Sequence, residues 1–486
     1  MSHAVIAGYR GLIATAASTV LLLAGCVTSN VKPELNALKP ANLGLAAAPN
    51  VAPAPQWWTA FGDPQLDRMM SDALRSNPGL EEAMARVRAA NAVIAENKAG
   101  LLPQINATSE ITNGRLTGAQ FVPPPYAGTN RWLGSVQTNF DWTLDFAGKQ
   151  RALINEARQS ANAAALDVVA ARLVLTGAVA ETYVNLTRAE RQAAIAQAFV
   201  DSRQKSLGLA KVRSRTGLSD DFDLRVSETL VAEAQQSLTR AQGERALLVH
   251  ALAALTGRGA DAYPEIRPST LSLDAVLLLP AQLPANLLER RPDVIAARSR
   301  IDAALAGRRA AYADFFPTVD LRAFAGFSSV GLGSLFSGNA LNYGGGPAVS
   351  VPIFEGGRLR AQYGQATAGV DVATAAYNGL AVQAVKQAAD ALSAIDTNAA
   401  DAAEQRRITE GFSQTERLSR VRLQSGLAPQ TDVLTSADRV LQAQLLQAGL
   451  DAEGAARRIQ LLVAVGGDFT PPPAKLAAVS TTTIRR

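Results

Sequence analysis

The segment Arg213-Ser214-Arg215-Thr216-Gly217-Leu218-Ser219-Asp220 returns later in the chain as Arg422-Leu423-Gln424-Ser425-Gly426-Leu427-Ala428-Pro429. Each copy follows a long run that contains no proline. A glycine in this place ends a helix because it can adopt the left-handed backbone conformation, and an aspartate or proline after it suits the start of another helix. The leucine after each glycine is expected to pack back on the last helical turn. Each copy therefore predicts a tight turn between two antiparallel helices.

The two turns belong to a duplication that covers most of the 486 residues. A shift of 209 residues superimposes 148–257 on 357–466 without a gap, and a shift of 214 superimposes 78–103 on 292–317. The offset changes only where the sequence has the pattern of strands. Each half is therefore expected to contain a helix, two strands and a long helical hairpin, arranged with pseudo-symmetry.

The helices before the two turns are predicted to be unusually long. Residues 148–216 and 357–425 are rich in Ala, Gln, Arg, Leu and Glu, and at 1.5 Å per residue each could reach roughly 100 Å, against about a dozen residues for a usual helix. The returning helices should end near Leu255 and Val465. Their apolar stripes are thin and rich in alanine, too small for a conventional globular core. Such hairpins need neighbours on both sides, as the wall of a tube would provide.

Four segments show the period-two alternation of amphipathic strands. They are 104–112, 132–144, 318–327 and 349–353. In 132–144 polar residues occupy odd positions from 135 to 143, and the even positions carry Trp132, Val136, Phe140, Trp142 and Leu144. A sheet of a soluble protein, with one face exposed to solvent, is the simpler alternative. The links 115–131 and 328–341 are longer than hairpin turns and are expected to be outward-facing loops.

The spacing of two tryptophans favours a membrane barrel over that alternative. Trp132 and Trp142 are ten residues apart, roughly 33 Å along a strand or about 25 Å after a tilt of about 40°, which fits two interfacial girdles. After the N-terminal segment we find no apolar run that could cross a bilayer as a helix, so a membrane span would have to be a barrel. The smallest membrane barrels need about eight strands, and four strands per chain therefore require an oligomer.

The N-terminus predicts export. Residues 1–25 have the layout of a signal peptide, with Arg10 before an apolar run. Cys26 is the only cysteine and follows Leu-Ala-Gly, which resembles the bacterial lipobox, in which the thiol is acylated. The alternative is a small buried side chain. Val27 stands where an aspartate would favour retention, so resemblance to lipoprotein sorting predicts the outer membrane. Residues 26–56, rich in proline and alanine, are expected to be an acylated tether.

Composition excludes several function classes. The formal net charge of +5 is small for this length, and basic residues are interleaved with acidic ones, which argues against a nucleic-acid partner. The sequence has no phosphate-binding glycine loop and no histidine cluster for a metal; once the signal peptide is removed, His250 is the single histidine. Arg290-Arg291 could suggest an anion site, but a helix entry at Pro292 explains the segment more simply. We therefore expect no enzyme, no cofactor and no metal.

Several stretches resemble one family, the TolC-like outer-membrane efflux lipoproteins of RND-type tripartite systems, and more closely their NodT-type branch. The resemblance runs from Trp57-Trp58 to Gly466-Gly467 and includes Leu287-Leu288-Glu289-Arg290-Arg291-Pro292-Asp293-Val294 and Pro352-Ile353-Phe354-Glu355-Gly356-Gly357. It implies an α+β membrane protein: a homotrimer with a twelve-stranded outer-membrane β-barrel, four strands per chain, continuous with a long periplasmic α-helical barrel. It also implies a periplasmic adaptor (membrane fusion) protein and an inner-membrane RND-type pump as partners.

This reading divides the chain into six parts. They are a signal peptide 1–25, the tether 26–56, a first repeat 57–257, an equatorial linker 258–286, a second repeat 287–466 and a C-terminal tail 467–486. The expected function is a passive exit duct for small toxic compounds in the outer membrane. Two alternatives stay open: an outer-membrane channel for type I protein secretion, and a structural lipoprotein that tethers envelope layers without a pore. Amphipathic strands argue against the tether, which has no use for them.

The candidate site residues fall into four groups. Cys26 is the expected lipid attachment, and Trp132 and Trp142 form the membrane girdle. By resemblance the turns dock the adaptor through Arg213, Gly217, Leu218, Arg422, Gly426 and Leu427. In many relatives an aspartate ring closes the tunnel, but here Thr435 occupies that position. The gate is therefore expected to use charged residues near the turns, facing Arg213, Arg215, Arg422 or Arg439 of neighbouring helices; its members are Asp220, Asp221, Asp223, Asp432, Thr435, Asp438 and Arg439.

Overall fold

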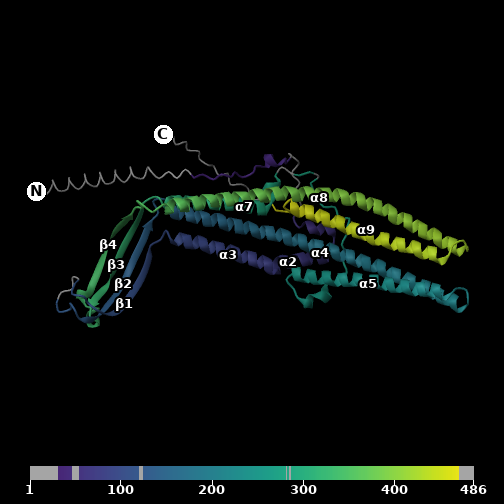
Figure 1. The fold of residues 1–486 in the computed structure, drawn as a ribbon, viewed down its shortest axis with the longest axis horizontal. Coiled ribbons are helices and arrows are strands. Elements are labelled where there is room, and N and C mark those ends of the chain that lie inside the picture. Colours follow the sequence, from purple (N-terminus) through teal and green to yellow (C-terminus); the bar gives the residue numbers. More distant parts are fainter. Residues whose placement is uncertain (1–30, 46–53, 120–123, 281, 284–285, 470–486) are drawn as a thin grey trace. The chain divides into compact units, whose positions relative to one another are not determined.

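A computed structural model describes residues 31–45, 54–119, 124–280, 282–283 and 286–469. Figure 1 shows the helices and strands of the chain, which divides into two compact units. The first contains Arg86–Ala164 and Ala297–Tyr377 together with the residues up to Ala37, and includes the whole sheet. The second contains Leu38–Ala85, Ala165–Ala296 and the residues from Asn378 onward, and includes both helical turns.

The sheet of the first unit is antiparallel, with its strands in the order β1-β2-β3-β4. The strands are β1 (Gln104–Arg115), β2 (Asn130–Leu144), β3 (Thr318–Val330) and β4 (Leu341–Ser350). Three predicted strands are confirmed, but the fourth was placed too far along the chain, because Val351 and Ile353 lie beyond the end of β4. The alternation of β4 is hidden by the triplet Gly344-Gly345-Gly346, which contributes no side chains to either face. The link before β4 is shorter than the predicted 328–341, because β3 continues to Val330, and it contains η5 (Leu332–Ser334) and η6 (Gly338–Ala340).

The register places the apolar rows of all four strands on one face of the sheet. Phe140 pairs with Ile105 on one side and with Ala323 on the other, and Val136 pairs with Phe327. Residues directly opposite each other in antiparallel strands point to the same face. The polar rows share the other face, where the Asn139 amide donates to Asn106 Oδ1 over 3.2 Å.

Helices repeat in pairs of equal length. They are α3 (Pro78–Ala99) and α7 (Pro292–Ala313) with 22 residues each, α4 (Lys149–Arg215) and α8 (Arg358–Gln424) with 67 each, and α5 (Asp221–Leu255) and α9 (Gln430–Ala464) with 35 each. Both boundaries of α4 and α5 return displaced by 209 residues, and those of α3 by 214. The two predicted helical hairpins are confirmed. In the tether, η2 (Pro40–Leu43) is the one helical segment among the described residues.

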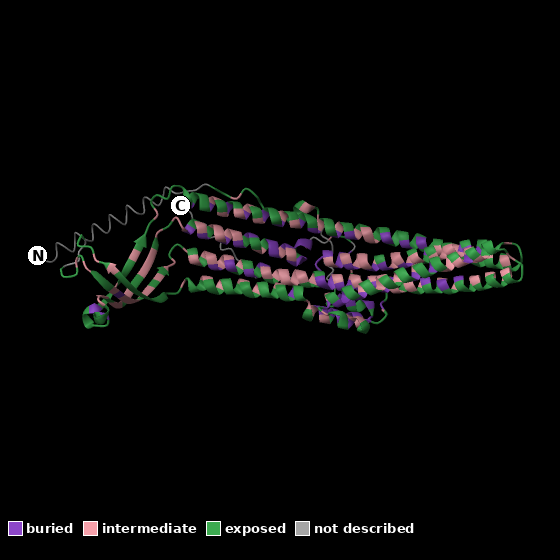
Figure 2. Ribbon diagram, turned by 60° about the horizontal axis from the view of Figure 1, so that its bottom comes forward, coloured by how far each residue is buried: buried purple, intermediate pink, exposed green. Residues whose placement is uncertain are grey.

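The largest core of the second unit forms where shorter segments cover the long helices. The segments η3 (Trp57–Phe61), α2 (Pro64–Ser76) and η4 (Ala260–Glu265) bury apolar side chains against the middle of α4 and the ends of α5 and α9. Figure 2 shows buried residues gathering around α2 and thinning toward the hairpin ends. The large buried residues that the hairpins lack are therefore supplied by α2, η3 and the predicted equatorial linker.

The expectation that no apolar run after the N-terminal segment could cross a bilayer as a helix is wrong for α4. This helix contains an 18-residue stretch that is long and apolar enough, by composition alone, to cross a membrane, and 39% of that stretch is buried within the chain. Leu175, Val179 and Val184 of α4 belong to the core beside α2. Their apolar character is explained by this packing, as in the core helix of other proteins.

The paired arginines before Pro292 occupy the positions that Ser76 and Asn77 hold in the first half. Arg291 donates to the Ala464 carbonyl at the end of α9 over 3.2 Å, and in the first half Asn77 donates to the Leu255 carbonyl at the end of α5 over 2.9 Å. The chain turns at Gly466, where φ is +95° and an added Cβ would lie 2.2 Å from the Arg290 carbonyl oxygen. The short helix α6 (Leu287–Arg290) ends there, and α7 begins two residues later at Pro292. Arg291 thus contacts the end of α9, and the predicted helix entry at Pro292, with Asp293 in the first turn, is confirmed.

Candidate functional site at the hairpin tips and the sheet

The two helical turns have the same backbone geometry. Gly217 and Gly426 have φ values of +69° and +72°. The next N–H donates back to the helix in each copy, from Leu218 to the Arg213 carbonyl and from Leu427 to the Arg422 carbonyl, both over 2.8 Å. This six-to-one bond is the Schellman motif, in which glycine supplies the left-handed residue. The predicted capping role of both glycines is confirmed.

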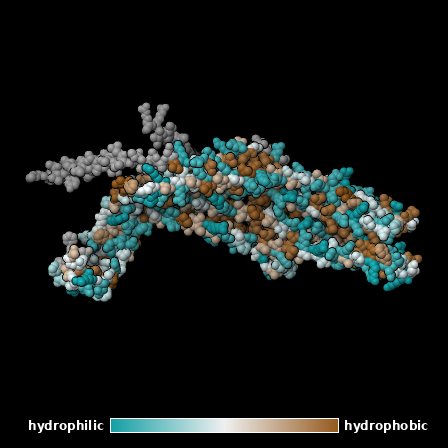
Figure 3. Space-filling model, in the orientation of Figure 1, coloured by the Kyte–Doolittle hydropathy of each residue, from teal (hydrophilic) through white to brown (hydrophobic). Residues whose placement is uncertain are grey.

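Both turn leucines point into solvent, contrary to the expectation that they pack back on the helix. Leu218 is 77% exposed and Leu427 is 71% exposed, and Phe222 at the start of α5 is 70% exposed. Figure 3 shows hydrophobic atoms at the ends of both hairpins. The Schellman bond already fixes the turn, so the leucine side chains are not needed for capping. They leave an apolar surface at each tip.

Acidic residues at the starts of the returning helices have a local structural role. The Asp220 carboxylate accepts the Asp223 N–H over 3.2 Å and so caps α5. Asp221 and Asp223 lie in the first turn of α5, and Asp432 lies in the first turn of α9. Carboxylates are stabilised there by the helix dipole. Pro429 holds the corresponding cap position of α9, which has no side-chain acceptor.

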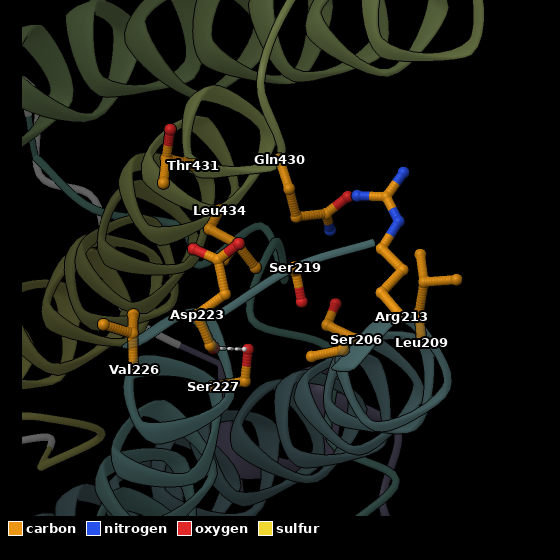
Figure 4. Close-up of a pocket in the computed structure, with 11 residues that line it drawn as sticks. Ser206, Leu209, Arg213, Ser219, Asp223, Val226, Ser227, Gln430, Thr431 and Leu434 are labelled. Atoms are coloured by element: carbon orange, nitrogen blue, oxygen red, sulfur yellow. Dashed lines mark hydrogen bonds between the residues drawn. The ribbon is translucent and has the colours of Figure 1, made fainter. Parts of the chain in front are cut away.

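A small cavity separates the first hairpin from the start of α9 (Figure 4). It is lined by residues of α4, α5, α9 and the first turn, including Arg213, Ser219, Asp223 and Gln430. Ser219 Oγ and Gln430 Oε1 are buried without a hydrogen-bond partner among the described residues. The two hairpins therefore meet near their tips across a space lined by both polar and apolar residues, and its unsatisfied polar atoms make this contact weaker than a packed core.

Farther from the tip, Asp438 forms an ion pair that joins the hairpins. Its carboxylate accepts a hydrogen bond from Arg203 of α4, whose side chain is 2% exposed. The Arg203 guanidinium also lies 4.5 Å from the centre of the Phe199 ring. Burial lowers the pKa of Arg203, and the charge of Glu233 partly opposes this shift. Sequence reasoning missed Arg203 because its partner is 235 residues away.

The remaining gate candidates lie at the surface. The Thr435 hydroxyl donates to the Thr431 carbonyl over 2.9 Å, within its own helix. Arg439 is exposed, with its guanidinium 5.9 Å from the centre of the Phe412 ring. In the part of the chain that the structure describes, no ion pair joins Asp220, Asp221 or Asp432 to an arginine of the turns. Contacts of these residues with arginines of neighbouring helices therefore remain a prediction.

The tryptophan pair lies on the apolar face of the sheet, at opposite ends of β2. Trp132 is 50% exposed. Trp142 pairs with Leu321, and its indole N–H donates to the Leu101 carbonyl over 2.9 Å. Each ring thus combines an apolar face with a polar group, as interfacial aromatic residues do. Cys26 lies outside the described residues, and within these no group of His, Cys, Asp or Glu could hold a metal ion.

Comparison with known proteins places this architecture in one family. The model of the outer membrane efflux protein family matches residues 69–258 and 283–467. The chain is 35% identical to the fusaric acid resistance protein FusA of Burkholderia cepacia over 74% of this chain and 70% of FusA. It is 30% identical to the outer membrane protein OprJ of Pseudomonas aeruginosa over 76% of this chain and 77% of OprJ.

Solved structures agree with the sequence comparison. The outer membrane protein VceC of Vibrio cholerae is 29% identical and superimposes with a TM-score of 0.78 over 86% of this chain and all of VceC. The family consists of channels and is not a family of enzymes. With its paired long hairpins and amphipathic sheet, the chain belongs to the outer membrane efflux protein family, whose members are exit ducts in the outer membrane.

Proposed function

We propose that three copies of the chain form this duct. Four strands from each copy close a twelve-stranded barrel in the outer membrane, and the hairpins form a helical tunnel through the periplasm. The observation that carries the proposal is the register: it collects the apolar rows on one face and the polar rows on the other. An apolar face suits lipid and a polar face suits an aqueous lumen.

The edges of the sheet support an oligomer independently. Within the described residues β1 and β4 each have one strand neighbour, so each leaves one row of backbone N–H and C=O groups without a partner strand. Unpaired edges are not tolerated in a hydrocarbon layer, where water cannot satisfy them. Pairing β1 of one copy with β4 of the next would satisfy both edges and close the ring.

The tips are proposed to dock a periplasmic adaptor that connects the duct to an inner-membrane RND-type pump. The exposed side chains of Leu218 and Leu427 support this proposal, since each tip offers apolar surface that capping does not require. Phe222 extends that surface on the first hairpin. Cys26 is proposed to carry the lipid that anchors the tether in the outer membrane.

The proposed cargo is small organic compounds. Relatives named for their cargo include the fusaric acid resistance protein FusA and the toluene efflux pump outer membrane protein TtgI of Pseudomonas putida, which is 30% identical over 84% of this chain. The test is deletion of the gene in its native host with complementation. Greater susceptibility to small aromatic compounds and solvents is expected, whereas loss of a secreted protein with unchanged susceptibility would favour type I secretion instead.

Assembly is tested on the purified protein. Native mass spectrometry in detergent should give a mass of three chains, and planar bilayers should show stable ion conductance. A monomer that conducts no current would contradict the duct. A conducting species with another number of chains would overturn the trimer alone.

A further inference from the structure

The polar face of the sheet carries a groove that crosses all four strands. Its volume is about 500 Å³, within the range of sites that bind small organic molecules. Five of its lining residues belong to the polar rows of β1, β2 and β3, and the others are Phe140, Ala323 and the β4 glycines Gly345 and Gly346. The five polar-row residues are Asn106, Asn139, Asp141, Arg322 and Phe324. The groove therefore combines amides, both signs of charge and one aromatic ring.

Phe324 is out of pattern on this face. It occupies the polar row of β3, between Arg322 and Gly326, and it pairs with Asn139 of β2 and Gly344 of β4. Its ring lies over Gly344, where an added Cβ would be 3.0 Å from the ring. An aromatic ring over a cross-strand glycine stabilises the pair. That contact covers only part of the ring, which stays half-buried beside polar groups.

The charged groups beside the ring are unequally satisfied. Asp320 accepts the Thr143 hydroxyl over 2.7 Å and an Arg322 N–H over 3.3 Å, and its side chain is 19% exposed. Asp141 is 52% exposed and lies 3.7 Å from Arg322 Nε. In the described part of the chain the Asp141 carboxylate makes no hydrogen bond. Two carboxylates share one guanidinium, so this cluster carries a net charge of about −1 at neutral pH.

We propose that this groove is a subsite for planar aromatic cations passing through the duct. The inference depends on the proposed function, in which the polar face lines the lumen. Asp141 is the diagonal neighbour of Phe324 on the adjacent strand, a separation of about 7–8 Å between backbones that one flat ligand can bridge. The ligand stacks its ring on Phe324, places its positive charge near Asp141 and receives hydrogen bonds from Asn139.

The test measures block of single-channel current by ethidium in planar bilayers. Phe324→Leu is expected to raise the half-blocking concentration about two- to fivefold, the loss expected for a partly exposed cation–π contact. Asp141→Asn should raise it about five- to tenfold, because a charge about 4 Å from the ligand is lost in partly hydrated surroundings. Conductance without ethidium should change little in both variants.

Two matched controls separate a subsite from general effects. Glu110→Gln removes one carboxylate from the polar face of the sheet, roughly 20 Å along the strands from Asp141. Leu133→Ala removes an apolar side chain from the row of β2 that contains Asp141. Both should leave ethidium block unchanged. Tetramethylammonium, a cation without a ring, and fluorescein, an aromatic anion, should block weakly in all variants.

The outcomes divide clearly. Equal loss of block in Glu110→Gln and Asp141→Asn would show that lumen charge alone acts, and strong block by fluorescein would show that Arg322 dominates; either result overturns the subsite. Normal conductance with ethidium block unchanged in Phe324→Leu also overturns it while leaving the duct intact. Absence of conductance in the wild type would instead contradict the proposed function.

Discussion

Asp438→Ala is the most direct test of how the hairpins are held together. The change removes the carboxylate that pairs with Arg203, whose side chain is 2% exposed and whose Nε and Nη1 atoms already lack partners among the described residues. A buried charge left without its partner costs about 3–5 kcal/mol. Asp438 itself is 39% exposed, so water can enter its place and the expected cost is lower, about 2 kcal/mol, as for a hydrogen bond to a charged group.

That cost appears as local opening, which hydrogen exchange measures. About 2 kcal/mol corresponds to roughly 30-fold faster exchange, since each 1.4 kcal/mol is a factor of ten. Peptides covering residues 430–445 of α9 should show it, and the same variant should spend more time in a high-conductance state in planar bilayers. Asp438→Asn keeps an acceptor and should lie between wild type and Asp438→Ala.

Arg225→Ala is the matched control, because it breaks an exposed ion pair with Glu228 on α5. Exposed pairs contribute about 0–1 kcal/mol, so exchange should change by less than about fivefold. Equal exchange in Asp438→Ala and Arg225→Ala would refute the argument that the buried Arg203 pair holds α4 against α9. Faster exchange in Asp438→Ala with unchanged conductance would confirm that the Asp438–Arg203 pair holds the helices together and would show that it does not take part in gating.

The other predictions concern the barrel, the anchor, the tip and the equatorial core. Val136→Arg should cost roughly 2–4 kcal/mol on the lipid face and Gln137→Arg should assemble normally; equal yields of heat-resistant trimer would contradict the face assignment. Cys26→Ser should abolish labelling by a radioactive fatty acid, and labelling equal to wild type would rule out this cysteine as the attachment site. Leu427→Ser should weaken adaptor binding in surface plasmon resonance, while the helix content measured by circular dichroism stays unchanged. Unaltered affinity would show that Leu427 does not contribute to adaptor binding. Burial tends to raise the pKa of Asp63, but hydrogen bonds from Tyr183, Gln65 and Thr270 lower it overall. A lowered folded-state pKa gives stability that is complete above the unfolded value near 3.9 and is lost as pH falls through the folded value. Asp63→Asn should therefore flatten the acid side of the melting-temperature profile below about pH 4, and parallel profiles would oppose this.

Much of the fold follows from local sequence. Runs without proline between glycine turns define α4 and α8, and the Schellman bonds at Gly217 and Gly426 involve only residues close in sequence. Alternation gives β2 because its side chains differ clearly in polarity from one face to the other. The repeat adds to this, since an element found in one half has a counterpart in the other.

Some features depend on tertiary structure because their cause is distant or leaves no local pattern. Gly344–Gly346 carry no alternation, and β4 is defined by its pairing with β3. Local turn chemistry could not show that Leu427 stays exposed, because that depends on what packs over it. Arg203 looks like any other arginine of a charged helix until α9 covers it and brings Asp438 to it. The sequence determined the local geometry of helices, turns and three strands, and tertiary packing decided which of their polar and apolar groups were left without water.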